Sequence, residues 1–196
     1  MASIYHSMQT TAQHRRTARR LAAAGLSLAL LLALGAGTGY AQSPTPLEYK
    51  VKGAFLLNFA KFVKWPAGAF ASADSPIVIG IAGPDPFGPV LDQLVSGETI
   101  GGRPILVTRL QPRDDPARCQ LLFVARQADA AGLLQRVDGA PVLTVGETDD
   151  FADDGGIIRL LIENNKVRFE VNRAAAQRAR LAISSQLLKL ARKIKS

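Results

Sequence analysis

The segment "PIVIGIAGPDPFGPVLDQLV" (residues 76–95) decides the fold class of this chain. Residues 76–83 form a nearly continuous apolar run rich in β-branched side chains, which is typical of a strand covered on both faces. Asp85 is placed to cap a following helix and Pro86 to occupy its first position. A buried strand followed by a turn and a helix is the basic unit of a parallel α/β sheet.

The chain after this segment repeats the same unit. Three further strands are predicted in residues 103–110, 119–125 and 140–146, and a helix in residues 128–137. Strands that alternate with helices favour a parallel sheet, although the connection over residues 111–118 is short for a full crossover helix. We therefore predict an α/β fold with four mainly parallel strands flanked by helices, followed by a C-terminal antiparallel β-hairpin and a terminal helix.

The hairpin is predicted from "GIIRLLIENNKVRFEVN" (residues 156–172), in which Asn164-Asn165 forms a two-residue turn. This turn predicts six facing pairs: Ile158 with Val171, Leu160 with Phe169, Ile162 with Val167, Arg159 with Glu170, Leu161 with Arg168, and Glu163 with Lys166. The first three pairs make one fully apolar face, and opposite charges meet across the other face, which favours this register. After the hairpin, Asn172 and Ser184 are predicted to cap two helices, the second of which extends through "SSQLLKLARKI".

An amphipathic helix is predicted in "EYKVKGAFLLNFAKFVKWP" (residues 48–66), ended at Trp65 by the proline that follows. Its apolar stripe is made of Val51, Phe55, Leu56, Phe59, Phe62 and Val63. Lys52 lies near this stripe, where its stem can cover apolar surface while its ammonium group reaches water. The phenylalanines are expected to be core residues, whereas the opposite side carries lysines.

Residues 1–41 have the organisation of a secretory signal peptide. Four arginines precede an uncharged apolar run, and small residues precede a cleavage site after Ala41. An uncleaved membrane anchor is the alternative, but the apolar run is at the short end for crossing a bilayer. The prediction is therefore an exported protein whose single α/β domain spans residues 42–196.

Composition excludes several classes of function for the exported chain. Removal of residues 1–41 would delete four arginines and no acidic residue, so that the net charge falls from +8 to +4 and nucleic-acid binding loses its support. His6 and His14 both lie in the leader, and Cys119 is the only cysteine of the whole chain. Nucleophilic triads that need histidine, zinc sites and intramolecular disulfides are thereby excluded. The acidic "ETDDFADDGG" loop does not fit the spacing of a calcium loop. We predict no catalytic residue, cofactor or metal site.

Three phrases together resemble the YfiR-like family of bacterial periplasmic proteins: "EYKVKGAFLLNFAKFVKWP", "IGIAGPDPFG" and "VRFEVNRAAAQRARLAISSQLLKLA". With "CQLLFVA" and "VLTVGETDDFADDGGII" the resemblance covers essentially residues 42–196. It implies a non-enzymatic regulator that binds and represses the periplasmic sensor region of an inner-membrane diguanylate cyclase, which lowers cyclic-di-GMP and affects biofilm and motility. Family members are reported to sense redox state through intramolecular disulfides. Cys119 matches one family cysteine but has no partner in this chain, and Arg180 stands where the family pattern has glycine.

Two surfaces are candidates for binding the partner protein. One is the lysine side of the N-terminal helix, with Leu57, Lys61, Lys64 and Trp65; the other is the outer face of the hairpin, with Ile157, Arg159, Leu161 and Arg168. For Ile157 and Leu161 the alternative is that a helix covers them. A homodimer, linked by an intermolecular disulfide of Cys119 or otherwise, is a further alternative, although a buried cysteine usually acts as a small apolar residue.

A second functional hypothesis is a periplasmic sensor domain that binds a small molecule. In parallel sheets, ligands bind in the crevice outside the carboxyl ends of the strands. The residues expected at this edge are Gly83, Asp85, Phe87, Arg126 and Glu147. A helix cap already explains Asp85 and is the favoured interpretation of this residue, and Arg126 could pair either with an anionic ligand or with Glu147.

Overall fold

The computed structural model describes residues 46–196, so the predicted leader and its cleavage site lie outside the described residues. The elements are α2 (Pro46–Phe62), β1 (Val63–Lys64), η1 (Ala67–Ala69), β2 (Ile77–Ala82), α3 (Pro89–Val95), β3 (Thr99–Ile100), β4 (Arg103–Leu110), η2 (Pro116–Arg118), β5 (Leu121–Val124), α4 (Ala130–Arg136), β6 (Leu143–Gly146), β7 (Ile158–Glu163), β8 (Lys166–Asn172), α5 (Arg173–Arg178), β9 (Ala182–Ile183), α6 (Ser185–Leu190) and β10 (Lys193–Lys195). Within these residues, no helix combines the length and apolar character needed to cross a bilayer.

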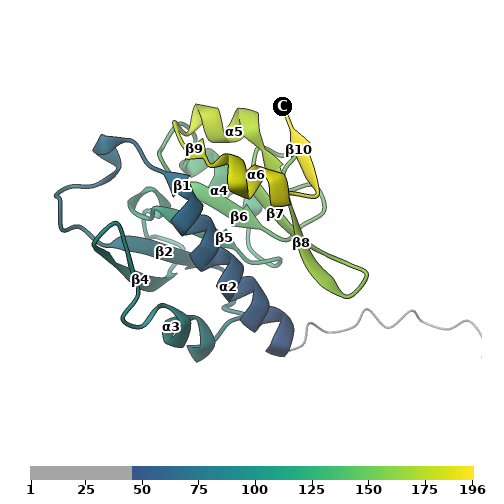
Figure 1. Cartoon of the computed structure of the whole chain (residues 1–196), viewed down its shortest axis with the longest axis horizontal. Coiled ribbons are helices and arrows are strands. Elements are labelled where there is room, and N and C mark those ends of the chain that lie inside the picture. Colours follow the sequence, from purple (N-terminus) through teal and green to yellow (C-terminus); the bar gives the residue numbers. More distant parts are fainter. Residues whose placement is uncertain (1–45) are drawn as a thin grey trace, which may run out of the picture. The chain divides into compact units, whose positions relative to one another are not determined.

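The central sheet has eight strands in the order β10-β8-β7-β6-β5-β2-β4-β3 (Figure 1). Its middle strands β4, β2, β5, β6 and β7 run parallel to one another, while β3 pairs antiparallel with β4 at one end and β7 forms an antiparallel hairpin with β8. The predicted α/β fold class is confirmed, and the parallel part is one strand larger than predicted because β7 joins it through β6.

Both faces of the parallel strands are covered, as the apolar run of the opening segment predicts. Alternate residues of a strand point to opposite faces. On one face, Ile79 and Ile81 of β2 belong to the main core with Leu56 and Phe59 of α2, the helix that crosses the front of the sheet in Figure 1. On the other face, Ala82 belongs to a second buried cluster against which residues of α4 pack.

The hairpin forms in the predicted register, with all six predicted pairs facing each other. Asn164 and Asn165 have φ values of 50° and 57°, the left-handed conformations of a type I′ turn, which asparagine tolerates better than most residues. The predicted caps are also confirmed, because the side chains of Asn172 and Ser184 accept hydrogen bonds from the amides of Ala175 and Leu187.

The N-terminal helix differs from the prediction in two respects. It ends at Phe62 and not at Trp65, because Val63 and Lys64 pair as β1 with the short strand β9. Its apolar stripe is also rotated toward Lys52, which is buried, whereas Val51 remains 37% exposed. The Lys52 side chain points inward because its ammonium group forms ion pairs with Glu48 and Glu147.

Two other boundaries were predicted wrongly. The helix after β2 begins at Pro89 and not at Pro86, although Asp85 still accepts hydrogen bonds from the amides of Phe87 and Gly88 and so shapes the turn before it. The terminal helix ends at Leu190, after which β10 pairs in parallel with β8. Pairing with an open sheet edge overrides helix propensity in this segment.

The acidic loop after β6 is anchored by the buried side chain of Phe151. Phe151 is fully buried, and its ring lies against Gly146 and Gly156. A Cβ atom at Gly146 would lie 2.3 Å from the nearest ring carbon, and one at Gly156 would lie 2.2 Å away. The two glycines therefore leave the space that the ring occupies. The buried ring anchors the loop, whose acidic residues lie on either side of Phe151.

Candidate functional site

A buried ionic cluster occupies the carboxyl end of β6. Glu147 is 3% exposed, and its carboxylate accepts hydrogen bonds from the Lys52 ammonium group and from the Tyr49 hydroxyl, the latter at 3.3 Å. Lys52, also 3% exposed, forms a second ion pair of 2.5 Å with Glu48 one helical turn earlier. Burial, together with the nearby Glu147 carboxylate, raises the pKa of Tyr49 to about 12. The cluster fixes the first turns of α2 to the sheet.

Arg126, which follows β5, contacts the backbone of Glu147 and not its side chain, so the ion pair given as one alternative does not form. Its guanidinium group donates to the backbone carbonyl of Glu147 at 3.0 Å, not to the carboxylate. The carboxylate is already occupied by Lys52 and Tyr49, which lie on a helix distant in sequence. Glu147 is thus engaged within the fold. The sequence signal is Lys52 near the apolar stripe of that helix, whose ammonium group was predicted to reach water but is buried against Glu147.

Asp85 and Phe87, two other expected cleft residues, have structural roles. Asp85 accepts from Nε of Arg109 at 2.9 Å, and the same guanidinium group binds Asp92 at 2.6 Å. The pKa of Asp92 is lowered by its hydrogen bond to Arg109. Phe87 is buried in the core, where its ring stands edge-on to Phe123 at a centroid distance of 4.8 Å.

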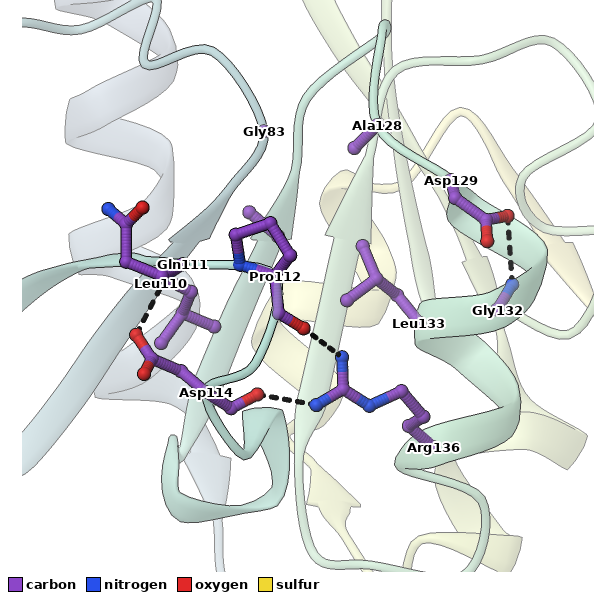
Figure 2. Close-up of a pocket in the computed structure, with 11 residues that line it drawn as sticks. Gly83, Leu110, Gln111, Pro112, Asp114, Ala128, Asp129, Gly132, Leu133 and Arg136 are labelled. Atoms are coloured by element: carbon purple, nitrogen blue, oxygen red, sulfur yellow. Dashed lines mark hydrogen bonds between the residues drawn. The ribbon is translucent and has the colours of Figure 1, made fainter.

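Gly83 is the one expected cleft residue that lines a large groove, which has a volume of about 530 Å³. The groove lies between α4 and the chain that follows β4 (Figure 2). Its lining consists of Ala82, Gly83, Leu110, Gln111, Pro112, Asp114, Ala128, Asp129, Gly132, Leu133 and Arg136. The groove therefore lies at the strand ends where the sequence predicts a crevice, on the face of the sheet that carries α4.

The two candidate partner surfaces lie on opposite faces of the sheet. Leu160 of the hairpin belongs to the core under α2, so by strand alternation Arg159, Leu161 and Arg168 point to the other face. The structure does not bring the lysine side of α2 together with the outer face of the hairpin. Each of the two surfaces has to be considered by itself.

On the α2 side, the expected residues are partly engaged. Lys61 forms an exposed ion pair of 2.9 Å with Glu98, and Leu57 packs partly against the core. The Trp65 indole N–H donates to the carbonyl of Gln120 at 3.1 Å, so this side chain anchors the segment after α2. Lys64 is exposed on β1.

On the hairpin, Ile157 is 3% exposed and belongs to the main core, so its side chain is not part of an accessible outer face. Arg159 pairs with Asp149 and, at 3.3 Å, with Glu170, which also binds Arg192 at 2.6 Å. Leu161 is partly exposed and Arg168 is exposed.

The tip of the hairpin exposes part of the face that the sequence predicts to be fully apolar. Ile162 is 45% exposed and faces the half-buried Val167, because α2 reaches only as far as the preceding pair, in which Phe169 contacts Phe55 and Phe59. A hairpin whose apolar stripe is longer than the helix covering it is the signal that could have predicted this exposure.

Cys119 is only 2% exposed and lies against Gly80 of β2. Burial, followed by the nearby acidic side chains, raises the pKa of its thiol to about 11. In the part of the chain from 46 to 196, no group of three or more His, Cys, Asp or Glu side chains is arranged to hold a metal ion.

Comparison with known proteins agrees with this architecture. The YfiR/HmsC-like family model matches residues 49–192, which is most of the chain, and the chain therefore belongs to this family. The family is one of regulatory, non-catalytic proteins of the periplasm that are associated with diguanylate cyclase signalling. No curated protein matches the chain.

Proposed function

We propose that residues 42–196, released by cleavage after Ala41, act in the periplasm as a non-enzymatic repressor of a membrane-bound diguanylate cyclase. The family assignment carries this proposal. The chain would bind the periplasmic sensor region of the cyclase and lower cyclic-di-GMP. A repressor of this kind works by binding the inactive conformation of its target more tightly than the active one, so no catalytic group is required.

The end of the β7–β8 hairpin is the surface that best supports such docking. Leu161 and Arg168 face each other on one side of it, and Ile162 and Val167 on the other. Arg168 has neither an ion pair nor a side-chain hydrogen bond with any residue of the described range, although the neighbouring Arg159 has both. Arginine is enriched at protein interfaces, and exposed apolar side chains beside it are a feature of surfaces that bind other proteins.

The proposal is tested by capture of a purified periplasmic sensor region with the purified protein. Reversing the charge of Arg168 (Arg168→Glu) is expected to weaken binding about tenfold or more, since unfavourable charge contacts at an interface cost affinity directly. Arg113→Glu is the matched control, because Arg113 is exposed on the connection between β4 and β5, away from the hairpin. Equal losses for both variants would show that net charge, not the hairpin, controls binding.

The biological part of the proposal has its own test. Cells that lack the protein are expected to contain more cyclic-di-GMP, and expression of the chain is expected to restore the lower level. Unchanged cyclic-di-GMP in both strains would contradict the proposed function whatever the binding experiment shows.

A further inference from the structure

The groove beside α4 occupies the point of the sheet where the chain reverses its direction of travel. From β2 the chain moves outward to β4, and it then returns past β2 to reach β5 on the other side. The helix after β2 and the helix after β5 contribute to different apolar clusters, on opposite faces. In open parallel sheets such a reversal leaves a crevice at the carboxyl ends of the strands, and ligands bind there.

Apolar and small residues line part of the groove. Leu110, at the end of β4, and Leu133 of α4 line it from opposite sides, and Pro112 and Ala128 also belong to its lining (Figure 2). Gly83 has a φ of 90°, and a Cβ atom there would lie 2.9 Å from Cβ of Ala128. The volume of about 530 Å³ falls within the range of roughly 300–1,000 Å³ that small-molecule sites have.

The polar groups of the groove have both signs of charge and unused hydrogen-bonding capacity. Arg136 reaches across from α4 and donates to the carbonyls of Pro112 at 3.3 Å and Asp114 at 2.5 Å (Figure 2), and within residues 46–196 it has no carboxylate partner. One oxygen of Asp114 accepts from the Gln111 amide, and one oxygen of Asp129 accepts from the Gly132 amide. The second oxygen of each carboxylate and the remaining N–H groups of the guanidinium are left for a ligand.

These features select the chemistry of the ligand. An anion would meet two carboxylates and a cation would meet a guanidinium group, so a net charge of either sign is disfavoured. An uncharged ring can lie between the two leucines, and a guanidinium plane stacks well on an aromatic face. We propose that this groove binds a small uncharged aromatic compound that carries both a hydrogen-bond donor and an acceptor.

The test uses benzamide, which has these properties, together with its charged analogues benzoate and benzylamine. Titration of the purified ¹⁵N-labelled protein with benzamide is expected to give saturable amide shifts around Gly83, Gly132 and Leu133, with a Kd of about 1 mM, which is normal for a fragment of this size. Benzoate and benzylamine are expected to bind at least about fivefold more weakly because each meets a like charge. Shifts located elsewhere, an absence of saturation, or equal affinity for all three compounds would overturn the proposal.

Two variants connect the binding to the groove. Ala128→Leu adds a bulky side chain to the lining of the groove and is expected to abolish the saturable shifts. Arg136→Gln removes the guanidinium group and is expected to bring benzylamine closer to benzamide in affinity, an effect that a loss of fold would not produce. Arg168→Gln, on the hairpin, is the control and is expected to bind benzamide unchanged. Because these measurements need no partner protein, their outcome is separate from that of the cyclase experiments.

Discussion

The buried pair Lys52–Glu147 allows a sharp prediction about stability. Both side chains are 3% exposed, so replacement of Lys52 by methionine leaves the Glu147 carboxylate in the interior without its counter-ion. Removing one partner of a buried pair typically costs about 3–5 kcal/mol. The Tyr49 hydroxyl still donates to Glu147, so we expect a loss of about 3 kcal/mol for Lys52→Met, at the lower end of that range.

The opposite replacement is expected to be milder. In Glu147→Gln, Lys52 keeps its ion pair of 2.5 Å with Glu48, and only part of its electrostatic environment is lost. We expect a cost of about 1–2 kcal/mol, the usual range for a buried polar group that loses one partner. The double variant Lys52→Met/Glu147→Gln removes both buried charges and should be more stable than Lys52→Met alone, because replacing a whole buried ion pair is often nearly neutral.

The measurement is urea unfolding of the unmodified protein, the two single variants and the double variant. A change of the unfolding midpoint at constant slope reports a change of stability. Lys61→Met is the matched control, since it breaks an ion pair of 2.9 Å with Glu98 that is exposed to solvent. Exposed pairs contribute about 0.2–1 kcal/mol. If Lys52→Met costs no more than this control, or if the double variant is as unstable as the sum of the single ones, the reasoning about the buried cluster is wrong.

Three further predictions concern other parts of the fold. Gly146→Ala forces a Cβ atom to within 2.3 Å of the Phe151 ring and should lower stability by about 1–3 kcal/mol in thermal unfolding, whereas Gly68→Ala, with open space around it, should be nearly neutral. Cys119, buried and with a pKa of about 11, should resist alkylation at pH 8 until the protein is unfolded, and rapid labelling of the native protein would contradict its placement. Asp92 has a pKa below its usual value of 3.8, so its charge stabilises the fold above that pH and ceases to do so as the pH falls through the lowered pKa; Asp92→Asn should reduce the acid sensitivity of unfolding, and an unchanged pH profile would contradict this.

The parts of the fold that the sequence predicts correctly are those whose determinants are local. The hairpin register follows from a two-residue turn and from facing charges, and the caps at Asn172 and Ser184 each involve an amide three residues away. The misplaced boundaries depend on distant partners. Val63 and Lys64 are not part of α2 because they pair with β9. In the same way, Lys193–Lys195 are not part of α6 because they pair with β8. Neither partner strand can be identified from local periodicity.

Arg180 occupies the position at which the family pattern has glycine, and the structure shows the backbone conformation that this position requires. Its φ of 57° is the left-handed conformation that glycine adopts without strain, which agrees with the glycine expected at this position. The chain nevertheless makes the predicted break there and continues into β9 and α6. A strain of about 1–2 kcal/mol for a side chain in this conformation is small enough for the surrounding packing to accommodate.

The candidate groove differs from the predicted cleft because the two faces of the sheet are covered differently at the carboxyl ends of the strands. Sequence reasoning placed Asp85, Arg126 and Glu147 at the carboxyl ends of the strands, and all three do lie beyond strand ends. On the face covered by α2, however, Lys52 and Tyr49 reach the edge and bind the Glu147 carboxylate, which is buried. On the face covered by α4, the short connection after β4 cannot fill the corresponding space, and the groove beside Gly83 remains open. The strand order determines where a crevice can form, but the side chains of distant helices determine which crevice stays available, and that information is absent from the strand ends themselves.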